Sequence, residues 1–186
     1  MSARHPISRP VTDAPLGLAR WLALALAMAL ALALCLPAPA APRKVRTPDE
    51  AQALVHRVAE FLKQNGRERT LAELNNPKGQ FVDGELYVFA YDTVGDGVLR
   101  ANVAFPLLVG KNLLDLTDPE GVPITRKVLE IGASKSGKGW LDYQWPNAMN
   151  GKFVELKTSY VERAGSLVLG CGIPKSWAAP AVGAKR

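Results

Sequence analysis

Cysteine and histidine are scarce in this chain of 186 residues, which contains two of each. The cysteines are Cys35 and Cys171, and the histidines are His5 and His56. So few thiols and imidazoles exclude a disulfide scaffold and a cysteine-based zinc cluster, and they argue against most metal-dependent enzymes. We therefore expect no metal site and no cofactor.

Acidic residues are outnumbered, since 17 Asp and Glu stand against 23 Lys and Arg and give a net charge of +6. The first 40 residues hold three of the basic residues and one of the acidic ones, so the remainder carries only +4. These charges are spread out and form no basic block or basic helix face. We therefore expect no nucleic-acid partner.

The first 40 residues have the three parts of a secretory signal peptide. Three arginines precede residues 21–36, which carry no charge, and small residues with prolines follow at 37–42. The uncharged run is shorter than the roughly 20 residues that a membrane-spanning helix needs. We expect export, cleavage after Ala40 and a periplasmic location. An uncleaved leader acting as a membrane anchor is the alternative.

The rest of the chain is expected to contain one α+β domain at 48–176, between a linker at 41–47 and a flexible tail at 177–186. Thr47 begins a capping box, and apolar residues at helical spacing predict a long first helix that ends at Gly66. The other predicted elements are helices at 67–75 and 124–134 and strands at 85–91, 98–103, 139–145, 153–162 and 167–173. They predict one antiparallel sheet with helices packed against it.

Motifs that would indicate catalysis are incomplete. Residues 132–138 resemble a phosphate-binding loop, but Gly139 stands where Ser or Thr is needed, and the segment follows a helix rather than a strand. A calcium-loop pattern fails because Val94 occupies a ligand position. His56 lies on a polar helix face and is expected to be solvated, while Cys171 is expected to be a structural thiol. We predict no enzyme activity and no catalytic residue.

Aromatic and hydroxyl side chains gather on the predicted strands. Tyr143 and Trp145 share one strand face because they are two residues apart. Lys157 interrupts an apolar strand, and an unpaired lysine is seldom buried. A lysine among tyrosine hydroxyls suits a small carboxylate. The alternatives are that the aromatics are ordinary core residues, and that Lys157 pairs with Asp142 or Glu155 or is solvated at the sheet edge.

Six ordered segments carry a family resemblance. They are residues 75–81 (NNPKGQF), 87–92 (YVFAYD), 108–113 (LVGKNL), 139–145 (GWLDYQW), 157–161 (KTSYV) and 170–173 (GCGI). Together they resemble the single Cache domain of the second type, over about residues 48–176. The resemblance implies a PAS-like fold in which a long N-terminal helix packs on a five-stranded antiparallel sheet. It also implies a pocket for short organic acids on the other face, in an extracytoplasmic bacterial sensor.

Members of that family often carry a His-Pro pair after the second strand, facing the ligand. Here residues 100–106 contain no histidine, so Arg100 or Asn102 is the candidate replacement. The predicted ligand-binding residues are Tyr91, Asn102, Trp140, Tyr143, Trp145, Lys157 and Tyr160.

The predicted function is that of a stand-alone periplasmic sensor domain. It is expected to bind a small molecule, such as a carboxylate, and to pass the signal to a membrane-bound sensor kinase or chemoreceptor, because nothing that could signal is seen after the domain. The alternative is a protein-interaction or accessory module with a vestigial pocket.

Overall fold

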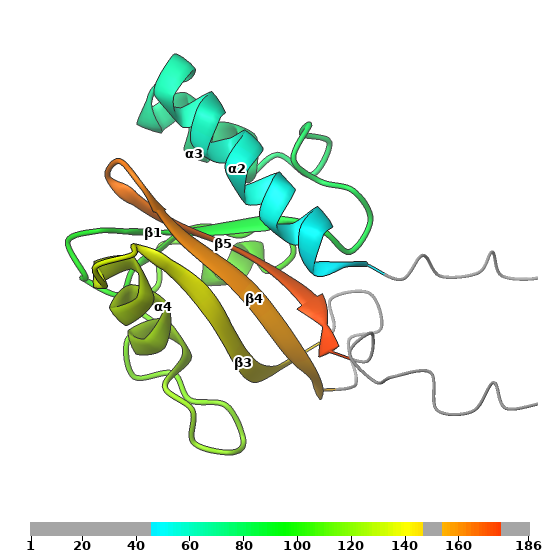
Figure 1. Ribbon diagram of the computed structural model, residues 1–186, viewed down its shortest axis with the longest axis vertical. Helices are drawn as coiled ribbons and strands as arrows, with labels where there is room; N and C mark the ends of the chain where they lie inside the picture. The colour runs from blue at the N-terminus through cyan, green and yellow to red at the C-terminus, as the bar shows by residue number, and fades with distance from the viewer. Residues whose placement is uncertain (1–45, 147–153, 176–186) are drawn as a thin grey trace, which may run out of the picture. The chain divides into compact units, whose positions relative to one another are not determined.

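The computed structural model describes residues 46–146 and 154–175 (Figure 1). The predicted leader and tail, and most of the predicted linker, lie outside these residues. Within the described part of the chain, no helix combines the length and the hydropathy needed to cross a bilayer.

Five strands form one antiparallel sheet, in the order β2-β1-β5-β4-β3. The strands are β1 (Val88–Asp92), β2 (Leu99–Ala101), β3 (Lys138–Pro146), β4 (Val154–Ala164) and β5 (Leu167–Pro174). The helices are α2 (Pro48–Asn65), α3 (Arg67–Leu74), α4 (Ile124–Ala133) and the single 3-10 turn η1 (Pro106–Leu108). This arrangement confirms the predicted α+β fold, with a long first helix packed on a five-stranded sheet.

Helix α2 begins and ends where the sequence predicts. The Thr47 hydroxyl accepts a hydrogen bond from the Glu50 backbone N–H, and the Glu50 carboxylate accepts one from the Thr47 N–H. Gly66 ends the helix with a φ of 77°, a conformation that glycine adopts without strain, and its N–H bonds to the Leu62 carbonyl. The two ends of α2 are therefore fixed by local chemistry.

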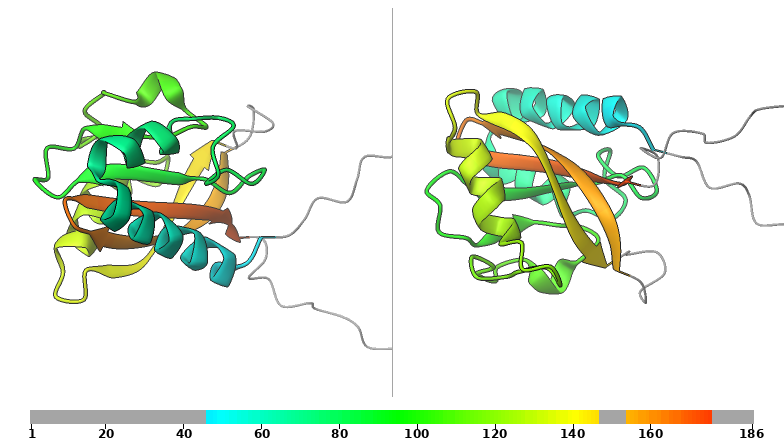
Figure 2. Two further views of the ribbon diagram at one scale, coloured as in Figure 1. Left: turned by 90° about the horizontal axis from the view of Figure 1, so that it is seen from above. Right: turned by 60° about the horizontal axis from the view of Figure 1, so that its bottom comes forward.

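The sheet has a different cover on each face, and Figure 2 shows α2 and α4 on opposite sides of it. Helix α2 packs Leu54, Val55 and Val58 against one face, where Val88 of β1 also lies. Helix α4 packs Val128 against the other face. We call these the α2 face and the α4 face of the sheet.

The first two strands are shorter than predicted. Strand β2 ends at Ala101 because the next residue starts a turn: the Asn102 side-chain oxygen accepts hydrogen bonds from the N–H groups of Ala104 and Phe105. Strand β1 starts only at Val88 because the preceding residues form a tight turn, in which Asp83 and Leu86 exchange both backbone hydrogen bonds.

Candidate ligand-binding site

A small aromatic cavity lies on the α4 face of the sheet. Its lining residues come from β1 and the residue before it, from β2, β3 and α4, and from the segment between β2 and α4. They are Tyr87, Phe89, Tyr91, Leu99, Asn102, Leu113, Leu116, Ile124, Thr125, Val128, Tyr143 and Trp145. The cavity volume is about 30 Å³, which is room for one or two water molecules. The volume is far below the roughly 300–1,000 Å³ of pockets that hold larger ligands.

Two glycines of β5 make room for this cavity between the rings of β1 and β3. A Cβ atom on Gly170 would lie 2.2 Å from Cζ of Phe89, and one on Gly172 would lie 2.7 Å from Oγ of Ser159 and 3.4 Å from the Tyr143 hydroxyl oxygen. Any larger residue at either position would therefore occupy space that these side chains now fill. The pair of glycines lets the aromatic side chains lie directly over strand β5.

The polar groups of the cavity are mostly hydroxyls. The Tyr91 hydroxyl lies 3.1 Å from Oγ1 of Thr125 on α4, and the Tyr143 hydroxyl lies 2.8 Å from Oγ of Ser159 on β4. Burial raises the pKa of both tyrosines above the ordinary value. Both phenols therefore stay neutral at physiological pH and can donate as well as accept hydrogen bonds.

Lys157 lies beside the cavity and is 5% exposed. It pairs in register with Tyr143 across β3 and β4, and its Cδ approaches the same side of Gly172 as the Tyr143 hydroxyl does. Its ammonium nitrogen is 3.5 Å from Oε1 of Glu155. This is one of the two ion pairs weighed in the sequence analysis, whereas the other candidate, Asp142, pairs with Lys175.

Of the two candidates for the missing His-Pro pair, only Asn102 reaches the cavity. The Arg100 guanidinium is held away from it, because its Nε donates to the Asp92 carboxylate at 2.6 Å and it also pairs with Asp96. Trp145 also lines the cavity, and its ring lies 5.5 Å from that of Phe105 in an edge-on contact. Asn102 and Trp145 are therefore wall residues of the cavity.

Trp140 and Tyr160 are not brought together with the other predicted residues. Tyr160 belongs to the core under α2, and the Trp140 ring lies 5.3 Å from it on the same face. The expectation of one shared site fails for these two because each is three positions from a cavity-side residue, Tyr143 or Lys157. An odd spacing along a strand places side chains on opposite faces.

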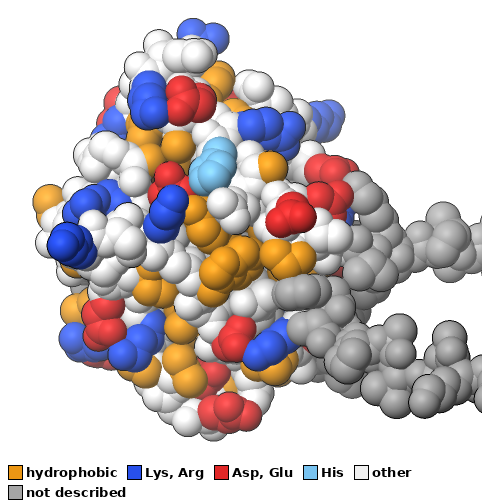
Figure 3. All heavy atoms as spheres, in the orientation of Figure 1, with side chains coloured by type: hydrophobic (Ala, Val, Ile, Leu, Met, Phe, Trp, Pro, Cys, Tyr) orange, Lys and Arg blue, Asp and Glu red, His pale blue; other side chains and the backbone are white. Residues whose placement is uncertain are grey.

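The α2 face carries exposed hydrophobic residues where α2 does not cover the outer strands. Trp140 is 42% exposed, and Leu156 and Val154 of β4 are 45% and 49% exposed. Figure 3 shows hydrophobic side chains gathered below the histidine on this side of the molecule. We call these three residues the Trp140 patch.

His56 contacts an acidic side chain, whereas the sequence analysis predicted a solvated imidazole. Its Nε2 lies 2.9 Å from Oε2 of Glu162, although the imidazole side chain is 47% exposed. The Tyr160 hydroxyl donates to the same carboxylate oxygen at 2.7 Å. His56 therefore links α2 to β4 on the face away from the cavity.

The sequence analysis missed Asp118, which fastens the cavity wall to β3. Its carboxylate accepts hydrogen bonds from the backbone N–H groups of Glu120, Val122 and Gln144, each at 2.9 Å. Burial opposes ionisation, but these hydrogen bonds prevail and lower the pKa of Asp118 below its usual range. The Asp-Pro-Glu-Gly turn was visible in the sequence, whereas the bond to Gln144 depends on tertiary contact.

Cys171 is fully buried in the core on the α2 face, and it is a free thiol. Burial raises its pKa to about 12, so the unreactive protonated form dominates at neutral pH. We expect Cys171→Ser to lower the free energy of unfolding by about 1–3 kcal/mol, because a hydroxyl is harder to bury than a thiol. Urea unfolding measures this loss, with Cys171→Ala as the control without a new polar group. Rapid thiol labelling of the folded protein would contradict a structural role.

Comparison with known proteins gives one family and a set of related folds. The family model described as Cache domain matches residues 61–173. A methyl-accepting chemotaxis protein from Vibrio parahaemolyticus has a TM-score of 0.58 at 23% identity, over 69% of this chain and 88% of that one. No curated protein matches the chain.

Two further solved structures have the same fold. One, described as showing carboxylic acid recognition by a Cache chemosensory domain, has a TM-score of 0.56 at 19% identity, over 68% of this chain and 91% of that one. The other, a periplasmic sensor domain of a chemotaxis protein, has a TM-score of 0.53 at 21% identity, over 83% and 98%. At these identities the structures support the fold alone, while the family match spans more than half of the chain. This chain therefore belongs to the Cache domain family.

Proposed function

We propose that this Cache domain binds a small organic acid in the aromatic cavity on the α4 face. The observation that carries the proposal is the buried Lys157 side chain, in register with Tyr143, beside a cavity that the neutral phenols of Tyr143 and Tyr91 line. An ammonium group supplies the charge that attracts a carboxylate, and phenols supply directional hydrogen bonds. Carboxylic acid recognition by a structural relative with the same fold supports this ligand class.

The ion pair of Lys157 with Glu155 is compatible with such a ligand. Their separation of 3.5 Å is longer than the roughly 2.7–2.9 Å of a short charge-assisted hydrogen bond. A ligand carboxylate that approaches Lys157 more closely would therefore gain a stronger contact than Glu155 now makes. Glu155 would keep the buried lysine neutralised while the site is empty.

The small volume of the cavity requires that its wall moves when the ligand binds. The segment between β2 and α4 forms that wall and contains only one short helical turn, η1. Loops of this kind open at lower free energy than core strands do. We propose that the wall near Trp145 and Asn102 moves outward to admit the acid.

The sensory role follows from the family and from the proposed location. We propose that residues 1–40 direct export and are removed, and that the domain acts in the periplasm. A structural relative described as a periplasmic sensor domain supports this location. A membrane-bound kinase or chemoreceptor would receive the signal. We propose no catalytic step.

A thermal-shift screen of short organic acids tests the proposal. We expect an acid at a hundredfold excess over its Kd to stabilise the wild-type protein by about 2.7 kcal/mol. Lys157→Met keeps the aliphatic stem and removes the charge, so we expect a folded protein without this response. Lys138→Met is the matched control, because this lysine is exposed at the start of β3. A Lys157→Met protein that responds like wild type would exclude Lys157 from the site.

A second function is favoured by the same cavity volume of about 30 Å³. A space of this size, next to a lysine that Glu155 already neutralises, is also expected of a vestigial pocket. The protein would then be an accessory or protein-interaction module. Failure of every acid in the screen to shift the wild-type protein would favour this second function over the first.

A further inference from the structure

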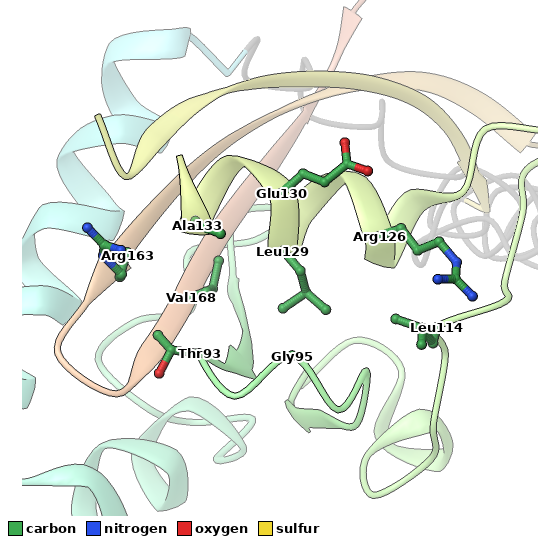
Figure 4. A pocket seen from close by; sticks show the side chains of 10 residues that line it. Thr93, Gly95, Leu114, Arg126, Leu129, Glu130, Ala133, Arg163 and Val168 are labelled. Carbon is green, nitrogen blue, oxygen red and sulfur yellow. The ribbon is translucent and has the colours of Figure 1, made fainter. Parts of the chain in front are cut away.

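A larger hollow lies along α4, outside the aromatic cavity (Figure 4). Its volume is about 480 Å³, which is within the roughly 300–1,000 Å³ of pockets that hold small ligands. Figure 4 shows Leu129 of α4 and Val168 of β5 pointing into this space. The hollow is therefore an open groove with an apolar floor, and we call it the α4 groove.

Glycines shape both walls of the α4 groove. A Cβ atom on Gly132 would lie 2.6 Å from Cγ2 of Val168, so a side chain at this position would lift α4 away from strand β5. The opposite wall is the turn that contains Thr93 and Gly95, where a Cβ atom on Gly95 would meet nothing within 4 Å. One wall is therefore packed tightly onto the sheet, and the other leaves open space.

Two arginines line the groove, one toward each end of α4. Arg126 lies near the start of the helix, while Arg163 of β4 lies beside its end, where its backbone N–H donates to the carbonyl of Gly137. Arg126 and Ala133, the last residue of α4, both line the groove and are separated by about 10 Å of helix. Figure 4 shows Arg163 on the Ala133 side and Arg126 on the other side of Leu129. The apolar floor therefore has a cation at each end.

Both guanidinium groups are available to an anion. Arg163 is exposed, and within residues 46–146 and 154–175 it forms no ion pair. Arg126 pairs with Asp115 at 2.5 Å, but the two side chains are 49% and 89% exposed, and such pairs contribute little stability. A carboxylate in the groove can therefore take the place of Asp115.

Glu130 also lines the groove, but it does not make the groove acidic. Its carboxylate accepts a hydrogen bond from Lys127 at 2.8 Å, which offsets its charge. Figure 4 shows this carboxylate and the Leu129 side chain on opposite sides of α4, so the charge points away from the apolar floor. With two arginines in the lining, the groove favours a ligand with negative charge.

We propose that the α4 groove binds an α,ω-dicarboxylic acid of medium chain length, with one carboxylate on Arg126 and the other on Arg163. A guanidinium group holds a carboxylate through two parallel hydrogen bonds. The methylene chain of the ligand lies over Leu129 and Val168, and a much shorter diacid reaches only one arginine. The groove is separate from the aromatic cavity, so this inference does not depend on the proposed function.

Isothermal titration calorimetry of the full chain with suberate, an eight-carbon diacid, tests this site. Octanoate has the same chain length with one carboxylate, and succinate has two carboxylates on a shorter chain. We expect each to bind at least about tenfold more weakly than suberate, because each loses one charge-assisted contact. Arg126→Gln and Arg163→Gln should each weaken suberate binding by a similar factor. In either variant suberate and octanoate should bind about equally, since only one guanidinium group remains.

Three further variants locate the site. Lys138→Gln is the control for charge, because Lys138 is exposed at the start of β3 and does not line the groove. Ala133→Trp, at an exposed position in the lining, should fill the groove and abolish suberate binding. Lys157→Met alters only the aromatic cavity, so suberate should bind this variant as it binds wild type. Circular dichroism checks that all variants fold.

Three results would overturn the proposal. The first is a wild-type protein that shows no binding of suberate. The second is binding that survives both arginine substitutions. The third is binding that Lys157→Met removes, which would place the diacid in the aromatic cavity and support the proposed function instead.

Discussion

We expect Gly170→Ala to lower the free energy of unfolding by about 2–3 kcal/mol, the upper part of the range for an overpacked core. The added methyl group would lie 2.2–2.8 Å from three atoms of the Phe89 ring. Phe89 is only 8% exposed, and its ring is in edge contact with Tyr91, so it cannot move without displacing a second buried aromatic side chain. Urea unfolding followed by circular dichroism measures the change.

Gly139→Ala is the matched control for that prediction. Gly139 is also a strand residue without a positive φ, but a Cβ atom there would meet only the flexible Ile131 side chain, at 3.3 Å. We expect its cost to be below about 1 kcal/mol. Equal losses in the two variants would show that glycine flexibility, rather than the Phe89 ring, determines the effect. The prediction would then be wrong.

We expect Asp118→Ala to lower the free energy of unfolding by about 2–4 kcal/mol, because three backbone N–H groups lose a charged acceptor. The side chain that would be removed is 6% exposed, so water does not readily replace it. The bond to Gln144 also joins the cavity wall to β3, one residue from Tyr143 and one from Trp145. Asp118→Ala should therefore loosen the candidate site as well as destabilise the fold.

The pH dependence of the free energy of unfolding tests whether the ionised Asp118 carboxylate stabilises the fold. Because its pKa is lowered in the folded state, its stabilisation is complete above the unfolded pKa of about 3.9 and disappears as the pH falls through the lower folded pKa. Asp118→Ala should therefore lose less stability than wild type on acidification below about pH 4. Asp118→Asn is the informative control, since its amide nitrogen would oppose the Gln144 N–H or those of Glu120 and Val122. Parallel stability curves for wild type and Asp118→Ala would contradict the prediction.

The same result bears on how the cavity opens. If the wall is the moving part in ligand binding, Asp118→Ala should increase amide hydrogen exchange in the segment between β2 and α4 more than in α2. The proposed ligand response at Lys157 can then be compared in proteins with a fixed and a loosened wall.

The positions of several predicted site residues could be deduced only in part from the sequence. Alternation along β3 correctly placed Tyr143 and Trp145 on one face. The same alternation, applied to Trp140 on β3 and Tyr160 on β4, would have placed both on the face opposite the cavity. The contact of Lys157 with Glu155 could also be predicted from the sequence, because residues two apart on a strand share a face. The ion pairs that hold Arg100 away from the cavity were harder to predict from the sequence, since one of them joins β2 to β1.

The sequence by itself determined the elements whose signals are local: the capping box and glycine stop of α2, the strand and helix order, and hence the α+β fold. The tertiary structure alone decided the strand order that sets Tyr87 and Tyr91 opposite Tyr143 across two glycines of β5. It alone decided the bond of Asp118 to Gln144, 26 residues away, and the pairing of His56 with Glu162. The physical reason is that capping and periodicity depend on neighbours in the chain. Register, cavity volume and ion-pair choice depend instead on how distant segments pack together.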